Sequence, residues 1–157
     1  MIILGIDPGI NTTGYGIIRT LQNDEMKIVE CGIISSPAKL EHSSRLKYIY
    51  DRLIDIIERQ KPDVVAIENL FHNKNLKSLV DVSEAIGVIT LAAANFNIRI
   101  EKFSPLKVKS AIVGFGRAEK EQVGMMIQNL LDLEVPPESH HISDALAVAV
   151  CYRNLHC

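Results

Sequence analysis

Hydrophobic residues recur along the chain at two spacings, and each spacing predicts one kind of element. Short apolar runs bounded by turn-forming residues are typical of strands, and they cover residues 2–7, 14–18, 27–34, 63–68 and 98–103. Apolar residues three or four positions apart are typical of helices, and they cover about 43–60, 76–95, 118–131 and 139–153, with a shorter helix opening at Pro105.

The order of these elements predicts the fold class. Three consecutive strands come first, helices and strands then alternate, and the chain finishes in helices. This order is typical of an α/β protein with a mixed five-stranded sheet flanked by helices. No repeat, linker or low-complexity segment interrupts the pattern, so we expect a single domain over residues 1–157.

The helix predicted over 76–95 is apolar on more than one face. Leu79, Val82 and Ile86 lie on one side, and Val80 and Leu91 extend the apolar surface around the helix. A helix that is hydrophobic nearly all round must be covered on both sides. We therefore expect one face to pack on the sheet of its own chain and the other to meet a second copy in a two-fold symmetric homodimer.

Composition narrows the class of protein. Hydrophobic residues make up 47% of the chain and charged residues 23%, the balance of an ordinary folded domain. The N-terminus shows no basic leader, no apolar run is long enough to span a bilayer, and the three cysteines show no paired spacing. We expect a cytoplasmic protein with no membrane partner, no disulfide framework and no zinc site.

A net charge of −2 does not argue against nucleic-acid binding, because a local basic surface is sufficient. Six basic residues and only two acidic ones fall between positions 99 and 120: Arg99, Lys102, Lys107, Lys109, Arg117 and Lys120, against Glu101 and Glu119. We call these six residues the basic segment. Taken alone, it is more typical of an ordinary solvated surface.

Three acids border otherwise apolar segments. Asp7 and Glu68 each end a predicted strand, and Asp144 opens the apolar part of the last helix, with His141 one turn earlier on the same face. Each acid alone could be a helix cap or a turn former. If they converge, their mutual repulsion calls for a cation, and oxygen ligands suit Mg²⁺ or Mn²⁺; an imidazole is also compatible with Mn²⁺.

Four short motifs make the chain resemble the RuvC family of Holliday junction resolvases. They are Ile6–Gly9 followed by Thr13–Gly16, Ala66–Glu68 with Phe71 and Asn75, Val113–Lys120, and Ser143–Ala147. They occur in the family's order and spacing over nearly the whole chain. The resemblance implies a ribonuclease H-like fold in which Asp7, Glu68 and Asp144 hold two Mg²⁺ ions.

The resemblance also implies roles for other residues. Many members carry a fourth acid where this chain has His141, so His141 is expected as a metal ligand or a proton-transfer group. Lys109 and Lys120 match lysines near the scissile phosphate. Phe71 matches an aromatic presented to a base at the crossover, although the local pattern alone is as typical of a core phenylalanine. Further expected DNA contacts are Lys74, Lys107 and Arg117.

The predicted function is a magnesium-dependent crossover junction endodeoxyribonuclease that resolves four-way junctions in DNA recombination and repair by paired nicks. A branch-migration helicase complex is an expected partner. The alternatives are a ribonuclease H-like RNA-processing nuclease, a catalytically inactive junction-binding module, and a sugar kinase or actin-like ATPase. The last class needs two such domains around a nucleotide cleft, and this chain has room for one.

Overall fold

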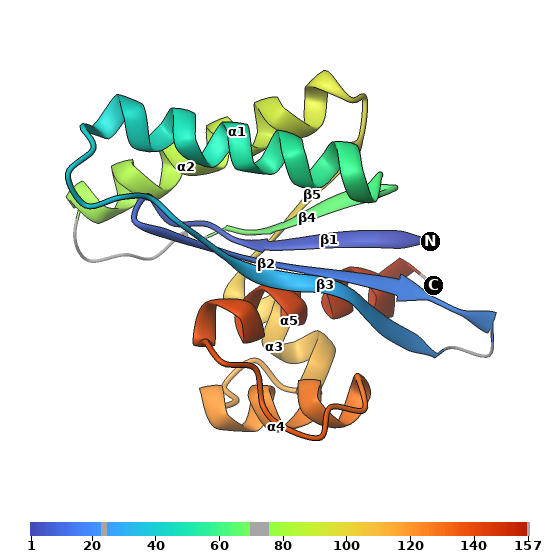
Figure 1. Cartoon of the computed structure of the whole chain (residues 1–157). Helices are drawn as coiled ribbons and strands as arrows, with labels where there is room; N and C mark the ends of the chain where they lie inside the picture. Colours follow the sequence, from blue (N-terminus) through green and yellow to red (C-terminus); the bar gives the residue numbers. More distant parts are fainter. Residues whose placement is uncertain (23–24, 70–75, 157) are drawn as a thin grey trace.

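The chain forms a five-stranded sheet with helices on both faces (Figure 1). The structure is a computed structural model and describes residues 1–22, 25–69 and 76–156. The strands are β1 (Ile2–Asp7), β2 (Thr12–Thr20), β3 (Met26–Ser35), β4 (Val64–Glu68) and β5 (Arg99–Phe103). The helices are α1 (His42–Gln60), α2 (Leu76–Asn95), α3 (Pro105–Val113), α4 (Lys120–Leu130) and α5 (His140–His156).

The sheet is mixed, as the element order predicts. Its strand order is β3-β2-β1-β4-β5. β1, β2 and β3 form an antiparallel meander, whereas β4 and β5 run parallel to β1. Parallel strands end at the same edge of a sheet, so the carboxyl ends of β1 and β4 lie side by side there.

Helices cover the two faces unequally. α1 and α2 lie on one face, and α3, α4 and α5 lie on the other (Figure 1). The first layer buries Leu53 and Ile89 against Leu4 and Ile67 of the sheet. The second buries Leu146 and Val150 of α5 with Phe103. Burial of such apolar area, at roughly 25 cal/mol per Å², is the main term that holds both layers on the sheet.

Two of the helices differ in how far they are buried. α5 carries nine buried residues on all of its sides, because the sheet lies on one side and α3 and α4 on the other. α2 buries Ala85, Ile86 and Ile89 on one face. Its opposite face exposes Leu76 at 77% and Leu91 at 55% in the single chain.

Helix bounds differ from the sequence-based expectation at two ends. α4 begins at Lys120 rather than near 118, because Glu119 and Gln122 form a capping box that satisfies the first backbone N–H groups. α5 continues to His156 rather than ending near Arg153, and the His156 imidazole packs against the ring of Tyr152 one turn earlier. Within the described residues, no helix has the length and apolar character needed to cross a membrane.

Candidate active site

Two of the predicted acids meet at the edge of the sheet. Ile6 of β1 pairs with Ile67 of β4 in parallel register, so the next residues, Asp7 and Glu68, end neighbouring strands. Asp7 is only 8% exposed, and Glu68 is half-buried. The strand ends therefore place two carboxyl groups close together in a poorly hydrated position.

Helix α5 brings the other two predicted residues to the same place. His141 Nδ1 lies 2.7 Å from Asp7 Oδ2, and Asp144, one turn further along α5, is close enough to raise the pKa values of both Asp7 and Glu68. Residues 134 positions apart in the sequence thus share a hydrogen bond. The structure brings together Asp7, Glu68, His141 and Asp144.

Glycines in the sheet allow α5 to approach this closely. Gly14 of β2 pairs with Asp7 of β1, and a Cβ at Gly14 would overlap the carbonyl oxygen of His141. A Cβ at Gly5 would likewise overlap the carbonyl oxygen of Ala145. The backbone of α5 therefore rests directly on β1 and β2, and this contact sets the height of His141 above Asp7.

A buried threonine shapes the turn that follows Asp7. The Thr13 hydroxyl donates to the carbonyl oxygen of Gly9 at 2.7 Å and accepts from the backbone N–H of Gly9 at 3.3 Å. Thr13 is fully buried. Thr13–Gly16 was recognisable in the sequence only as part of a motif, and the two hydrogen bonds of the Thr13 hydroxyl were not predicted.

Burial and mutual repulsion oppose the ionisation of two carboxyl groups of the site, Asp7 and Glu68. Burial raises the pKa of Asp7 above its usual range, and the charge of Asp144 adds to this, while the hydrogen bond from His141 and the charge of Lys120 oppose it. Burial, followed by the charges of Asp7 and Asp144, raises the pKa of Glu68 to about 7. These carboxylates pay a free-energy cost for being ionised together.

This donor set fits a divalent cation. Three carboxyl groups supply the oxygen ligands that Mg²⁺ and Mn²⁺ take, and a bound cation would relieve the repulsion that raises the pKa of Glu68. His141 adds a nitrogen ligand compatible with Mn²⁺. The side chains present are therefore consistent with the predicted metal centre.

Two lysines border the acids. Lys120 Nζ lies 3.3 Å from Asp144 Oδ2, and the charge of Lys109 lowers the pKa of Glu68. These four residues line a hollow of about 200 Å³ next to the carboxylates. Lysines and grouped acids at one opening can bind a phosphodiester. The lysines attract its phosphate, and a cation held by the acids would neutralise the charge on its oxygens.

Other residues of the basic segment make contacts away from the acids. Arg99, at the start of β5, pairs with Glu101 and lies over the ring of Tyr152. The Lys107 ammonium lies 5.3 Å from the ring centre of Phe103. Arg117 is exposed in the loop before α4. Only Lys109 and Lys120 of this segment line the hollow beside the acids. Phe71 and Lys74 lie outside the described residues.

A second group of donor side chains was not anticipated from the sequence. His42 at the start of α1 contacts Glu84 of α2, and its Nδ1 lies 3.9 Å from Asp81. One donor atom from each of these residues lies within 4.8 Å of the others. Asp81 and Glu84 share a face of α2 but are not adjacent to His42 in sequence, so only the packing of α1 against α2 reveals this cluster.

The fold, the grouped acids and the flanking lysines define a nuclease of the ribonuclease H-like class. Residues 3–152 match the family model described as crossover junction endodeoxyribonuclease RuvC. The chain belongs to the RuvC family, as the four motifs indicate.

Relatives and solved structures agree on this family. The chain is 49% identical over 152 residues to the crossover junction endodeoxyribonuclease RuvC of Alkaliphilus metalliredigens, covering 97% of this chain and 92% of the relative. It is 42% identical over 154 residues to that of Halothermothrix orenii, covering 98% and 93%. A structure of Thermus thermophilus RuvC in complex with a Holliday junction substrate superposes with a TM-score of 0.93 at 28% identity, covering 99% of this chain and 96% of the other.

Proposed function

We propose that this protein is a structure-selective endonuclease that resolves four-way DNA junctions by paired, symmetric nicks during recombination and repair. The observation that carries the proposal is the convergence of Asp7, Glu68 and Asp144, with Lys120 paired to Asp144 at 3.3 Å. Three acids with a cationic border are suited to hydrolysing a phosphodiester, and family membership supports junction DNA as the substrate.

We assign each residue of the site a separate role in phosphodiester hydrolysis. Asp7, Glu68 and Asp144 would hold two Mg²⁺ ions, or Mn²⁺ in their place. Bound there, such ions would supply an activated water and charge stabilisation for the leaving oxygen of an in-line displacement. Lys109 and Lys120 attract the phosphate and hold it beside the acids. As the water loses a proton to a base, its oxygen attacks phosphorus. The bond from phosphorus to the leaving sugar oxygen breaks, and that oxygen takes a proton from solvent to become a hydroxyl.

His141 has a position that suits two of its expected roles. Its Nδ1 is hydrogen-bonded to Asp7, so the ring orients the Asp7 carboxylate. Nε2 takes no part in this contact, and we assign to it either a metal ligand role or acceptance of the proton of the attacking water.

We also propose that two copies pair through the outer face of α2. Leu76, Val80, Gly87 and Leu91 lie along one side of this helix, and a Cβ at Gly87 would meet nothing within 4 Å. Apolar side chains around an open glycine allow a second helix to approach closely, and a self-complementary contact is the common arrangement for such a face. A dimer supplies two sites for the two strands that must be cut.

We also propose DNA contacts outside the group of acids. Phe71 would stack on a base at the crossover, and Lys74, Lys107 and Arg117 would contact phosphates away from the cut. We expect the protein to act in the cytoplasm, where a branch-migration helicase complex would deliver the junction.

A panel of substrates tests the proposed function. The purified protein is incubated with Mg²⁺ and a four-way junction, a linear duplex of the same sequence, or an RNA–DNA hybrid. We expect the junction to be cut at least about a hundredfold faster than either alternative. Preferential cutting of the hybrid would favour the RNA-processing alternative, and junction binding without cutting in any divalent metal would favour an inactive binding module.

A further inference from the structure

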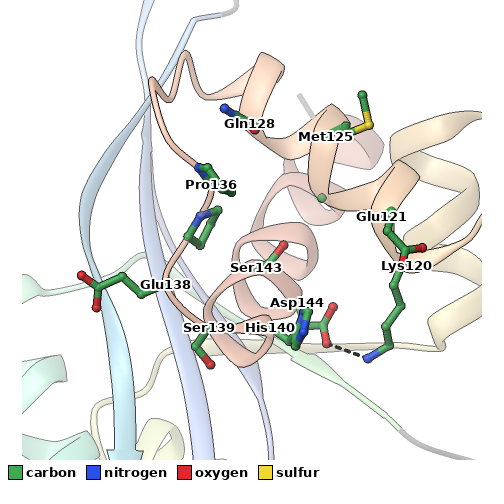
Figure 2. A pocket seen from close by; sticks show the side chains of 12 residues that line it. Lys120, Glu121, Met125, Gln128, Pro136, Glu138, Ser139, His140, Ser143 and Asp144 are labelled. Atoms are coloured by element: carbon green, nitrogen blue, oxygen red, sulfur yellow. Dashed lines mark hydrogen bonds and ion pairs between the residues drawn. The ribbon is translucent and has the colours of Figure 1, made fainter.

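A second, larger hollow adjoins the acids on the side of α4. It has a volume of about 610 Å³ and lies between α4, the N-terminal half of α5 and the segment that leads into α5 (Figure 2). Met125 of α4 and Pro136 of the facing segment form opposite walls, with Ser143 of α5 between them. Nothing in the mechanism above uses this space.

The hollow borders the active site. Lys120 and Asp144 line both this hollow and the smaller one that contains Glu68 and Lys109. Figure 2 shows their ion pair at one end of the larger hollow. A DNA strand whose scissile phosphate lies between the acids and lysines therefore has its adjoining nucleotide at the mouth of this hollow.

The walls favour a flat, neutral group. Met125 is 66% exposed although it is hydrophobic, and Pro136 and Pro137 offer apolar surface opposite it. A thioether and proline rings pack well on an aromatic face, and a binding site for a small aromatic group is usually an apolar hollow with a few polar groups.

The charges of the hollow do not favour a phosphate. Glu121 and Asp144 line it together with Lys120 and His140, and the Lys120 ammonium is already paired with Asp144, whereas Figure 2 shows the Glu138 carboxylate directed away from the hollow. Carboxylates repel the DNA backbone but accept hydrogen bonds from the exocyclic amino groups of bases. Ser143 and Gln128 add neutral polar groups; the Gln128 amide is held by donation to the carbonyl oxygen of Leu133 at 3.1 Å.

We propose that this hollow is a base-binding site, which takes the unpaired base of a nucleotide adjoining the scissile phosphate. The proposal rests on the proposed function, because it needs a strand bound at the acids. It assigns a role in choosing where the junction is cut, since only a base that leaves its stack and enters the hollow brings its neighbouring phosphate to the acids.

A variant with a larger side chain in the hollow tests the proposed base-binding site. A Cβ at Gly124 of α4 would meet only Ser143 Oγ, at 3.8 Å, so Gly124→Leu places a side chain in the hollow with little strain on the helix. Once the cut position on a four-way junction is mapped, the base of each adjoining nucleotide is removed in turn, leaving an abasic sugar. Single-turnover cleavage rates are then compared between the intact and abasic junctions.

For the wild-type protein we expect the intact junction to be cut about tenfold faster than one of the two abasic junctions, because a stacked base contributes strongly to binding. Gly124→Leu should remove that difference by slowing the intact junction alone. Met125→Ala, at an exposed position that cannot unfold the helix, should also reduce it. Asn129→Leu, on α4 but outside the hollow, is the matched control and should keep the wild-type ratio.

Three results overturn the inference while leaving the proposed function intact. One is equal wild-type rates on intact and abasic junctions at both neighbours. Another is equal slowing of intact and abasic junctions by Gly124→Leu, with Met125→Ala keeping the wild-type ratio. The third is faster cutting of both junctions by Glu121→Gln with no base dependence, which would mean that the backbone occupies the hollow. A wild-type protein that cuts no junction at all contradicts the proposed function itself.

Discussion

Asp7 lies among groups that act on its ionisation in opposite directions. Burial and Asp144 raise the pKa of its carboxyl, while the 2.7 Å contact with His141 and the charge of Lys120 lower it. A side chain so enclosed serves best as a fixed ligand, because the hydrogen bond sets its orientation before any cation binds.

Replacing Asp7 by Asn should abolish cleavage and spare junction binding. The amide keeps the shape but loses the charge that holds a divalent cation, so the rate should fall by roughly a thousandfold, equivalent to several kcal/mol. The dissociation constant from gel shift should change by less than about threefold, because phosphate contacts elsewhere position the DNA. Near wild-type cutting by this variant would remove Asp7 from the metal centre.

Glu68 makes the stability of the metal-free protein depend on pH. Its pKa is about 7 in the folded chain against 4.5 for an ordinary glutamate. The folded state therefore holds a proton between these values that the unfolded state has lost, and stability falls as pH rises from about 4.5 through 7. Asp7, Asp144, Lys109 and Lys120 are the charged groups that face it.

The variant Glu68→Gln should remove this dependence. In a chelator, the wild-type free energy of unfolding should drop by roughly 1–3 kcal/mol more than that of the variant between pH 5 and pH 8. Added Mg²⁺ should restore the wild-type stability at pH 8 and do little for the variant. Denaturant titrations at the two pH values give the comparison, and parallel curves for the two proteins would contradict it.

At the scale of elements, the contact of α5 with β1 and β2 positions half of the active site. Gly14→Ala should push the N-terminal turn of α5 away from the sheet, because the new Cβ would meet the backbone of His141, which cannot rotate aside. We expect a loss of roughly 3 kcal/mol in stability, the upper range for overpacking. Cleavage should also fall in conditions where the variant is fully folded.

Gly16→Ala is the matched control on the same strand. There the two nearest atoms belong to the Leu146 side chain, at 2.6 and 2.8 Å, and the backbone nitrogen of Leu146 follows at 3.1 Å. Leu146 is fully buried and must shift, but the backbone contact is looser than at Gly14, so the cost should be smaller, about 1–2 kcal/mol, and activity should be retained. Melting curves and single-turnover rates measure both effects. Equal behaviour of the two variants would mean that the close approach of α5 at Gly14 does not set the geometry of the site.

Sequence patterns were sufficient to predict the order of the helices and strands and to single out the three acidic residues as candidates. β1, β4 and α2 begin and end within one residue of the expectation, because an unbroken apolar run or a turn residue marks each boundary. The positions of Asp7, Glu68 and Asp144 at strand and helix ends made their convergence possible, and the family resemblance implied it. Lys109 and Lys120 came from the family resemblance, and no local pattern would have separated them from Lys107.

The contacts between separate helices and strands could not be predicted from the sequence. The helix predicted to be apolar all round was α2, yet α5 is the one that is buried on every side, because α3 and α4 fold over it. The hollow beside α4 and the His42–Asp81–Glu84 cluster depend on how separate helices pack. Periodicity describes one element at a time and does not contain that information.

At the scale of the whole molecule, α2 carries an apolar face that the described part of a single chain leaves exposed. Leu91→Glu places a charge on its exposed apolar face, and we expect monomers at micromolar concentration where the wild type sediments as a dimer. The variant should still nick junctions but lose the pairing of the cuts, because each nick then needs an independent encounter. Leu155→Glu, at an exposed leucine near the end of α5, is the control and should stay dimeric. A monomeric wild-type protein that still makes paired cuts would contradict the dimer.

The most direct measurement for the central claim is to map the cuts on a mobile four-way junction labelled on each strand in turn. With Mg²⁺, we expect nicks in two opposing strands at positions related by the two-fold symmetry of the junction, and none when a chelator replaces the metal. Both nicks should form within the lifetime of one protein–junction complex. Cuts at unrelated positions, cuts in a single strand only, or cutting that persists in the chelator would contradict the account.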